Sequence, residues 1–248
     1  MTRILSSIFY INSMRSTSAE FNNDTSIENI GILCGEKLEE LPYWETINDY
    51  LKRFSSDELQ KVVWQLVHRL IRSRAFEDAR IRGKYWQIII DGTQLYRSRE
   101  DLGEHSLFCR KKKGTEEEYT EYYYYVLEAK LVLHEKIQVS ILTEFIENEK
   151  RDVEKQDCER NGAKRLMDRL KKEFPMLPIC ICGDSLYASE GFFKDCRKNH
   201  WRYILRFKEG SIPSINQEHD TLKKLEKNRK EEAEGVYDYV TGIDYRGE

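Results

Sequence analysis

YWQIIIDGTQLY, residues Tyr85–Tyr96, predicts a buried β-strand that carries one carboxylate to its end. Three consecutive isoleucines suit a strand buried on both faces, because isoleucine packs well on a pleated surface and an unpaired charge does not belong inside one. We therefore expect Asp91 at the rim of a sheet, followed by a turn at Gly92. The alternative is that Asp91–Thr93 is only a turn, since Asp and Gly are common turn residues for reasons unrelated to chemistry.

A second stretch of the same design favours chemistry over a simple turn. In PICICGDSLY, residues Pro178–Tyr187, a short apolar run again ends in an Asp beside a glycine. Two strands that each bring an acid to the same edge of a sheet can place both carboxylates on one Mg²⁺, a hard cation that takes oxygen ligands. We therefore predict that Asp91 and Asp184 lie on adjacent strands and form a nuclease-like site for Mg²⁺ or Mn²⁺.

The length and composition describe a globular protein. With 248 residues, 40% of them hydrophobic, the chain can hold one large domain, or one domain and a small appendage, around a real core. No apolar run approaches the roughly 20 residues needed to span a bilayer, and Ile4–Ile11 is too short and too polar at its edges for a signal peptide. We therefore predict a cytoplasmic protein without a membrane partner. The six cysteines follow no paired framework, so we expect them to be reduced.

The net charge of -3 is unusual for a nucleic-acid binder, because such proteins usually carry a basic excess that neutralises phosphates. Two local basic patches nevertheless offer DNA contacts, one on and after a predicted helix and one in a predicted loop. The candidate DNA-binding residues are Arg72, Arg74, Arg82, Arg110, Lys111, Lys112 and Lys113. The alternative for each patch is a solvated face without a partner.

The first third of the chain predicts a small helical unit. Residues 1–35 show no clean period and predict a helix remnant followed by a loose linker. Pro42–Leu51 predicts one short helix, and Ser55 is the expected N-cap of the next. Apolar residues recur at helical spacing from Leu59 to Ile71, so this second helix should bury one stripe.

The remaining segments predict strands and crossover helices. Arg97–Thr120 predicts a polar loop, in which His105 and Cys109 have the spacing of half a metal site, although no second pair follows at a workable distance. The other predicted elements are an antiparallel hairpin of Glu121–Leu133 and Ile137–Ile146, helices over Arg151–Phe174 and Ala188–Asn199, and a last strand over Trp201–Phe207.

This order of elements predicts the fold class. Three strands are followed by helix, strand, helix and strand, with the two acids on the first and fourth strands. A mixed sheet that opens with a meander and continues through crossover helices is the order of an RNase H-like fold. We therefore predict an α/β fold with an RNase H-like mixed five-stranded sheet, preceded by a small all-α unit. The predicted domains are a helical region that offers a DNA contact at residues 1–84, the catalytic core at 85–210 and the start of an insertion region at 211–248.

Six motifs carry a resemblance to a known family, over roughly residues 40–215. They are Leu41–Ile47, Ile90–Thr93, Tyr125–Val132, Thr143–Asn148, Lys155–Glu159 and Gly183–Tyr187. Together they resemble the DDE transposases of bacterial insertion sequences. The resemblance implies two Asp and one Glu that hold two divalent ions, which activate water and then a DNA 3′-hydroxyl for in-line attack on a phosphodiester. Asp91 matches the first acid and Asp184 the second.

The third acid of that family, a Glu on a helix after the fifth strand, has no match. The charged segment Asn216–Glu234 predicts a helix, but its glutamates form a repetitive charged face without the Tyr and Arg that flank the family's Glu. Tyr237–Tyr245 then alternates like a strand. We expect a C-terminally truncated transposase, in which strand transfer fails because one ligand is missing.

Three functions remain as alternatives. The first is transposase-type cleavage and strand transfer by two-metal chemistry, with Mg²⁺ or Mn²⁺ as the cofactor. The second is a catalytically dead DNA-binding or interaction remnant of a transposase, and the third is an RNase H-like hydrolase that acts without integration. The implied partners are DNA, both transposon ends and target, and a second copy of the chain.

Overall fold

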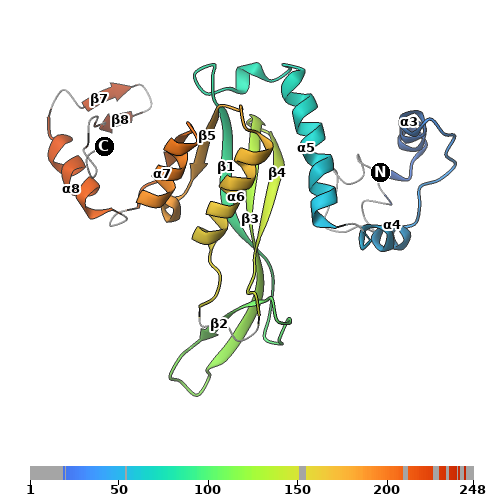
Figure 1. Ribbon diagram of the computed structural model, residues 1–248, viewed down its shortest axis with the longest axis horizontal. Coiled ribbons are helices and arrows are strands. Elements are labelled where there is room, and N and C mark those ends of the chain that lie inside the picture. Colours follow the sequence, from blue (N-terminus) through green and yellow to red (C-terminus); the bar gives the residue numbers. More distant parts are fainter. Residues whose placement is uncertain are drawn as a thin grey trace. The chain divides into compact units, whose positions relative to one another are not determined.

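The computed structural model describes residues 19, 21–53, 55–150, 155–208, 212–225, 229–232, 235–238, 240 and 243, without the side chains of residues 33, 56, 229–232 and 235–238. The chain divides into two compact units, residues 1–73 and residues 74–248. Figure 1 labels the helices of the first unit and the sheet of the second.

The first unit contains the helices α3 (Asp24–Cys34), α4 (Trp44–Leu51) and α5 (Ser56–Arg72). The start of α5 is fixed by a capping box, as its sequence predicts. The Ser55 side chain accepts the backbone N–H of Glu58, and the Glu58 carboxylate accepts the N–H of Ser55. These two bonds satisfy backbone donors that a helix start leaves without partners.

The loose linker predicted within residues 1–35 is wrong over α3. Asn23 caps this helix by accepting the N–H of Ser26, and the helix ends at Gly35 in the left-handed conformation, with φ +71°. Ile30 is buried against Leu41, from beyond the helix. The polar residues that suggested a linker therefore include a helix cap, while residues 1–18 lie outside the described residues.

The second unit is built on a six-stranded mixed sheet. Its strands are β1 (Trp86–Ser98), β2 (Leu107–Lys111), β3 (Tyr119–His134), β4 (Ile137–Ile146), β5 (Ile179–Gly183) and β6 (Arg202–Leu205). The order is β4-β3-β1-β5-β6, and β2 pairs with the first residues of β3. Because β1, β2 and β4 pair with β3 antiparallel, while β5 and β6 continue parallel from β1, only β3 runs against the other strands of this sheet. An α/β fold with a mixed sheet is thus confirmed, with one strand more than predicted.

The strand β1 differs from its prediction in two ways. Trp86, Ile88 and Ile90 are buried, but Ile89 is only half-buried, so the strand is not fully buried on both faces. The strand also does not turn at Gly92, because its backbone stays paired with β3 as far as Ser98. Asp91 therefore marks the end of the buried part of β1, not the end of the strand.

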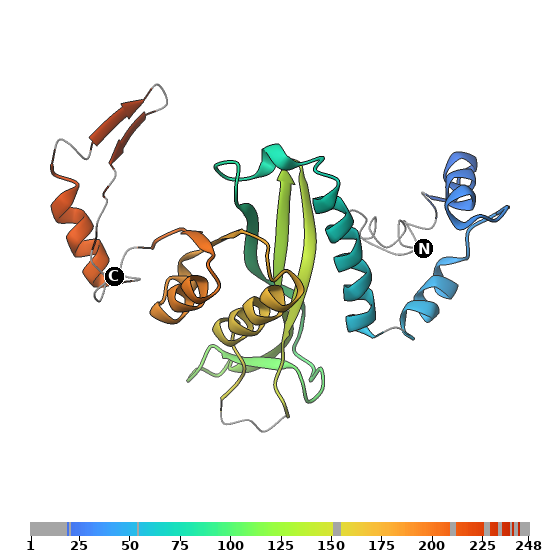
Figure 2. The same ribbon diagram turned by 45° about the horizontal axis from the view of Figure 1, so that its top comes forward.

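The polar loop predicted over Arg97–Thr120 is wrong where β2 forms. Leu107 is buried and Lys111 is exposed, so β2 leaves the core within five residues. Figures 1 and 2 show β1 and β3 running beyond the part of the sheet that the helix α6 (Glu159–Glu173) covers, to end beside β2. We call this uncovered extension, together with β2 and the turn 112–118 that joins it to β3, the arm.

Two helices pack on the sheet of this unit. Helix α6 contacts β4 and β3, and α7 (Glu190–Lys198) contacts β6 and α6. Gly162 allows the close approach of α6, because a Cβ there would meet Ile146 of β4 at 2.1 Å. The helix predicted at Ala188–Asn199 is confirmed as α7, and its expected buried residues are Phe192, Phe193 and Cys196.

The helix predicted to begin at Arg151 begins instead at Glu159. Cys158 is its N-cap and is extended, with φ -144° and ψ 160°. The charge alternation that predicted an earlier start continues through Lys155–Cys158, which is not helical; residues 151–154 lie outside the described residues.

The C-terminal segment contains a shorter helix than predicted, α8 (Pro213–Leu222), and a two-stranded sheet of β7 (Arg229–Glu232) and β8 (Gly235–Asp238). The helix predicted over Asn216–Glu234 is therefore wrong at β7. The strand predicted over Tyr237–Tyr245 agrees with β8 at Tyr237 and Asp238, and most of its other residues lie outside the described residues. All six cysteines are free thiols. Among the described residues, no helix has the length and apolarity to cross a bilayer.

Candidate active site at the ends of β1 and β5

The pairing of β1 with β5 brings the two predicted acids together. The two strands are parallel neighbours, with Ile88 opposite Ile181 and Ile89 opposite Cys182. Continuing this register by two residues places Asp184 opposite Asp91. Both carboxylates are exposed. Asp91 thus lies within β1, and Asp184 directly follows the last residue of the neighbouring strand β5.

Each of the two carboxylates accepts a hydrogen bond from a nearby backbone N–H. Asp91 Oδ1 accepts the N–H of Gly92 at 3.0 Å. Asp184 Oδ1 accepts the N–H of Leu186 at 2.9 Å, and in this way caps the 3₁₀ turn η2 (Ser185–Tyr187). A carboxylate fixed through one oxygen keeps its second oxygen for a ligand.

Strand alternation decides the direction in which these acids point. Successive side chains of a strand point to opposite faces, so Asp91 lies on the face opposite to Ile90 and Gly92. By the same alternation Asp184 lies opposite to Gly183, and a Cβ added at Gly183 would meet Ile90 at 3.3 Å. The two carboxylates thus share one face, and the two glycines share the other.

A third acid, Glu159, reaches the glycine side of the same strands. It is the first residue of α6, and its carboxylate accepts hydrogen bonds from the hydroxyls of Tyr125, at 2.8 Å, and Tyr187. A Cβ added at Gly92 would lie 2.7 Å from the Glu159 carboxylate carbon and 2.2 Å from the Tyr125 hydroxyl. Glu159 is therefore packed directly against the backbone that follows Asp91.

The two tyrosines remain protonated donors to Glu159. Burial, the hydrogen bond to Glu159 and the charge of Glu159 all raise the pKa of Tyr125 and of Tyr187. Asp91 adds to the rise for both tyrosines, and Asp184 adds to it for Tyr187. Both hydroxyls thus lie within electrostatic reach of Asp91 as well as of Glu159, and the Tyr187 hydroxyl also lies within reach of Asp184.

Sequence reasoning assigned no role to Glu159, although it lies in the motif Lys155–Glu159. The segment before it is held by long-range contacts. Gln156 donates to the carbonyl of Phe108 at 2.8 Å and accepts the N–H of Phe108 at 2.6 Å, so its amide binds β2 as a neighbouring strand would. Buried Asn148 accepts the N–H of Asp157 at 3.2 Å. The signal that could have found Glu159 is this polar motif directly before a helix.

Ion pairs fasten the first turns of α6 to β4. Arg165 contacts Asp157 at 2.7 Å and Glu144 at 2.6 Å, and Arg169 contacts Glu144 at 2.8 Å. Glu144 is only 8% exposed, so these two guanidinium groups compensate a buried charge. Burial acts to raise the pKa of Asp157, but the hydrogen bonds from Arg165 and from the N–H of Cys158 outweigh it, and the pKa lies below its usual value. The position of Glu159 is therefore fixed from both sides along the chain.

Asp91 and Asp184 supply some, but not all, of the ligands that a site for a hard divalent cation needs. Asp91 and Asp184 offer exposed carboxylate oxygens from adjacent strands, the kind of ligand that Mg²⁺ and Mn²⁺ accept. Among the described residues, however, no group of three or more His, Cys, Asp or Glu side chains is arranged to hold a metal ion. Alternation explains why Glu159 does not complete one, since it approaches from the glycine side. His105 and Cys109 also form no such group, and the His105 ring bonds the carbonyl of Asn148 at 2.9 Å.

No protein-family model, curated protein or solved structure matches this chain.

The predicted DNA-binding residues are all exposed. Arg72 is the last residue of α5 in the first unit, whereas Arg74 and Arg82 belong to the second unit and have positive φ angles of 57° and 54°. The exposed members are Arg72, Arg74, Arg82, Arg110, Lys111, Lys112 and Lys113.

The basic run of the arm is partly neutralised. Lys111 contacts Glu121 at 3.8 Å, and Lys112 pairs with Glu117. Arg110 and Lys113 form no ion pair within the described residues, and both line a hollow of about 330 Å³ that also includes Gln156. Two of the four basic side chains are therefore available to an anionic partner.

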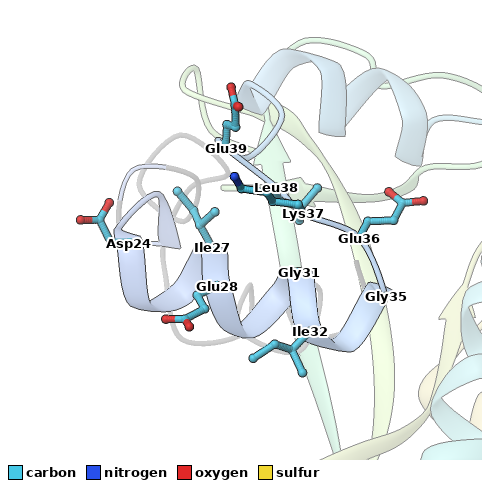
Figure 3. A pocket seen from close by; sticks show the side chains of 10 residues that line it. All are labelled: Asp24, Ile27, Glu28, Gly31, Ile32, Gly35, Glu36, Lys37, Leu38 and Glu39. Atoms are coloured by element: carbon cyan, nitrogen blue, oxygen red, sulfur yellow. The ribbon is translucent and has the colours of Figure 1, made fainter.

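The first unit has a hollow of its own, of about 600 Å³, beside α3 (Figure 3). Ile27 and Leu38 contribute apolar surface to it, and Asp24, Glu36 and Glu39 point away from it. It contains none of the predicted site residues and no group of three metal-ligating side chains among the described residues.

Proposed function

We propose that the chain is a transposase-type enzyme core of the DDE class, with an RNase H-like fold and with Asp91 and Asp184 as its metal ligands. The observation that supports this proposal most is the parallel register of β1 and β5, which brings Asp184 opposite Asp91 when it is continued two residues past Cys182. The strand order β4-β3-β1-β5-β6, with only β3 reversed, supports the RNase H-like part. The RNase H-like fold is expected from this order, a three-strand meander followed by two parallel strands.

The chemistry of the proposed site follows from its exposed acid pair. A bound Mg²⁺ or Mn²⁺ would supply Lewis-acid stabilisation of the charge that develops on a phosphodiester during in-line attack. The chain contributes two carboxylates whose free oxygens face the same side, and the N–H groups of Gly92 and Leu186 hold these carboxylates in orientation. Orientation of this kind matters because misplacement by about 1 Å can cost about a hundredfold in rate.

A second candidate function is a DNA-binding or interaction protein without catalysis. It is favoured by the lack of a third carboxylate beside Asp91 and Asp184 in the described part of the chain, and by the exposed Arg110 and Lys113 of the arm. An RNase H-like hydrolase that cleaves without joining ends remains the third candidate.

Metal-dependent nicking of supercoiled plasmid DNA tests the leading proposal. We expect slow nicking with Mg²⁺ or Mn²⁺ and none with a chelator. Asp91→Asn and Asp184→Asn should each remove it, because loss of a carboxylate charge weakens a divalent site far more than it changes the fold. Asp168→Asn is the matched control, since Asp168 is exposed on α6 and touches neither acid.

The outcomes separate the candidates. Nicking that survives both Asp91→Asn and Asp184→Asn would refute the proposed site. Binding of DNA with no nicking by any metal supports the second candidate. Cleavage of an RNA–DNA hybrid in preference to plasmid DNA supports the third.

A further inference from the structure

Glu159 connects the two backbone segments that carry the acid pair. Its carboxylate is shared by Tyr125, which comes from β3, and by Tyr187, which ends the turn η2. These three side chains are called the clamp below. Three elements that are far apart in sequence, β3, α6 and η2, thus meet at one carboxylate.

The first branch of the clamp leads to Asp91. Glu159 and the Tyr125 hydroxyl together fill the space above Gly92, so closely that no Cβ fits there. The N–H of Gly92 in turn donates to Asp91 Oδ1. Any displacement of Gly92 would therefore move the donor that orients the Asp91 carboxylate.

The second branch leads to Asp184. Tyr187 is buried, with 2% exposure, and it is the last residue of the turn that Asp184 caps. The N–H that Asp184 accepts belongs to Leu186, the residue before Tyr187. A Tyr187 ring fixed by Glu159 therefore holds in place the donor that orients the second carboxylate.

We propose that Glu159 is a positioning residue, which uses the hydroxyls of Tyr125 and Tyr187 to hold Asp91 and Asp184 in one arrangement. This inference deepens the proposed function and rests on it, because the arrangement matters for binding a divalent cation at the acid pair. Glu159 acts through its neighbours and not as a ligand, since it lies on the glycine side of β1 and forms no three-acid group with the pair.

The test uses single-atom changes that keep the shape of the clamp. Tyr125→Phe, Tyr187→Phe and the double variant each delete hydroxyl donors, and Glu159→Gln removes the charge. Tyr124→Phe is the control, because Tyr124 is also on β3 but donates to the carbonyl of Leu102 at 2.5 Å. Thermal melting confirms that each variant folds. The Phe variants keep the test decisive if Glu159→Gln does not fold.

Two measurements are made on the full chain. Amide hydrogen exchange is followed at Gly92 and Leu186, which needs neither metal nor activity. We expect faster exchange at Gly92 in Tyr125→Phe and at Leu186 in Tyr187→Phe, and no change at either in Tyr124→Phe. Mn²⁺ affinity is then measured by titration. The double Phe variant should bind Mn²⁺ about 10- to 100-fold more weakly, the range found when residues that orient metal ligands are changed.

Each result has a distinct meaning. Unchanged exchange at both amides, or Mn²⁺ affinity equal to that of the parent in the double Phe variant, overturns the positioning role. Loss of Mn²⁺ binding in Glu159→Gln alone, with the double Phe variant unaffected, also overturns it, because Glu159 would then be a ligand itself. If exchange responds as expected but the parent binds no Mn²⁺, the clamp stands and the proposed function fails.

Discussion

At Gly92 the backbone of β1 packs directly against two side chains of the clamp, Tyr125 and Glu159. A Cβ at this position would lie 2.2 Å from the Tyr125 hydroxyl and 2.7 Å from two atoms of the Glu159 carboxylate, distances that real Cβ contacts do not show. Both neighbours are held by other contacts, so they cannot move away freely. Glycine here allows the close approach of these two side-chain ends at an ordinary φ angle.

We expect Gly92→Ala to separate Glu159 from β1. Overpacking of this kind should lower the free energy of unfolding by about 1–3 kcal/mol. If the proposed function holds, Mn²⁺ binding should weaken as well, because the N–H of Gly92 orients Asp91. Urea unfolding and Mn²⁺ titration of the same protein samples measure both effects.

The control for this substitution is Gly191→Ala. Gly191 lies in α7, and a Cβ there would meet no atom within 4 Å. Alanine is the better helix former by up to about 1 kcal/mol, so this variant should be neutral or slightly more stable. A Gly92→Ala protein as stable as the Gly191→Ala protein would contradict the close packing at Gly92.

At the scale of single residues, the sequence indicates candidate metal ligands, but it does not indicate the long-range contacts of the residues around them. The positions of Asp91 and Asp184 at neighbouring strands could be predicted because each ends an apolar run beside a glycine, which is a local pattern. Glu159 could not, because its role depends on Tyr125 and Tyr187, which are 34 and 28 residues away. The polar motif Lys155–Glu159 before α6 indicates that Glu159 starts a helix, but it does not indicate which tyrosines donate to it.

The strand β2 shows how an element can depend on a distant side chain. It pairs with β3 along one side, and the amide of Gln156 binds Phe108 in both directions from 48 residues away. Its sequence ends in Arg110 and Lys111, which favour a solvated loop on local grounds. The elements predicted correctly, such as β4, α7 and the start of α5, have hydrophobic periods or caps within their own sequences.

We expect Gln156→Ala to destabilise both β2 and the segment Lys155–Cys158 that precedes Glu159. The loss leaves the N–H and C=O of Phe108 without their partner, at a cost of about 1–3 kcal/mol for partly buried groups. Amide exchange at Phe108 should rise, and exchange at Gly92 should rise less. The control is Gln138→Ala, an exposed residue of β4. Equal exchange at Phe108 in the parent and the Gln156→Ala variant would show that pairing with β3 alone holds β2.

For the whole molecule, the net charge of -3 limits the affinity for DNA. Association must depend on local basic residues, while the remaining surface repels phosphates. Within the described part of the chain, Arg110 and Lys113 of the basic run form no ion pair. The exposed Arg72, Arg74 and Arg82 add further positive charge. Binding should therefore be weak and lost at modest salt.

Strand transfer should be absent or very slow for a related reason. In-line phosphoryl transfer in two-metal sites stabilises both the attacking and the leaving oxygen. The described residues bring two carboxylates, not three, to the edge of the sheet. A loss of several kcal/mol of transition-state stabilisation corresponds to at least about a thousandfold in rate.

The last prediction joins these two properties in one experiment on a labelled DNA duplex. Fluorescence anisotropy over a series of NaCl concentrations should give a straight line of log affinity against log salt, with a slope of about 0.9 per neutralised phosphate. The double variant Arg110→Gln with Lys113→Gln should make that slope less steep, by the amount expected for the loss of about two phosphate contacts. Lys164→Gln with Lys172→Gln, both exposed on α6, should leave it unchanged. An unchanged slope in the arm variant would remove the arm as a DNA contact. Gel electrophoresis of the same labelled duplex after incubation with Mg²⁺ measures strand transfer, and joining of DNA ends by the parent at a normal rate would mean that a third carboxylate completes the site.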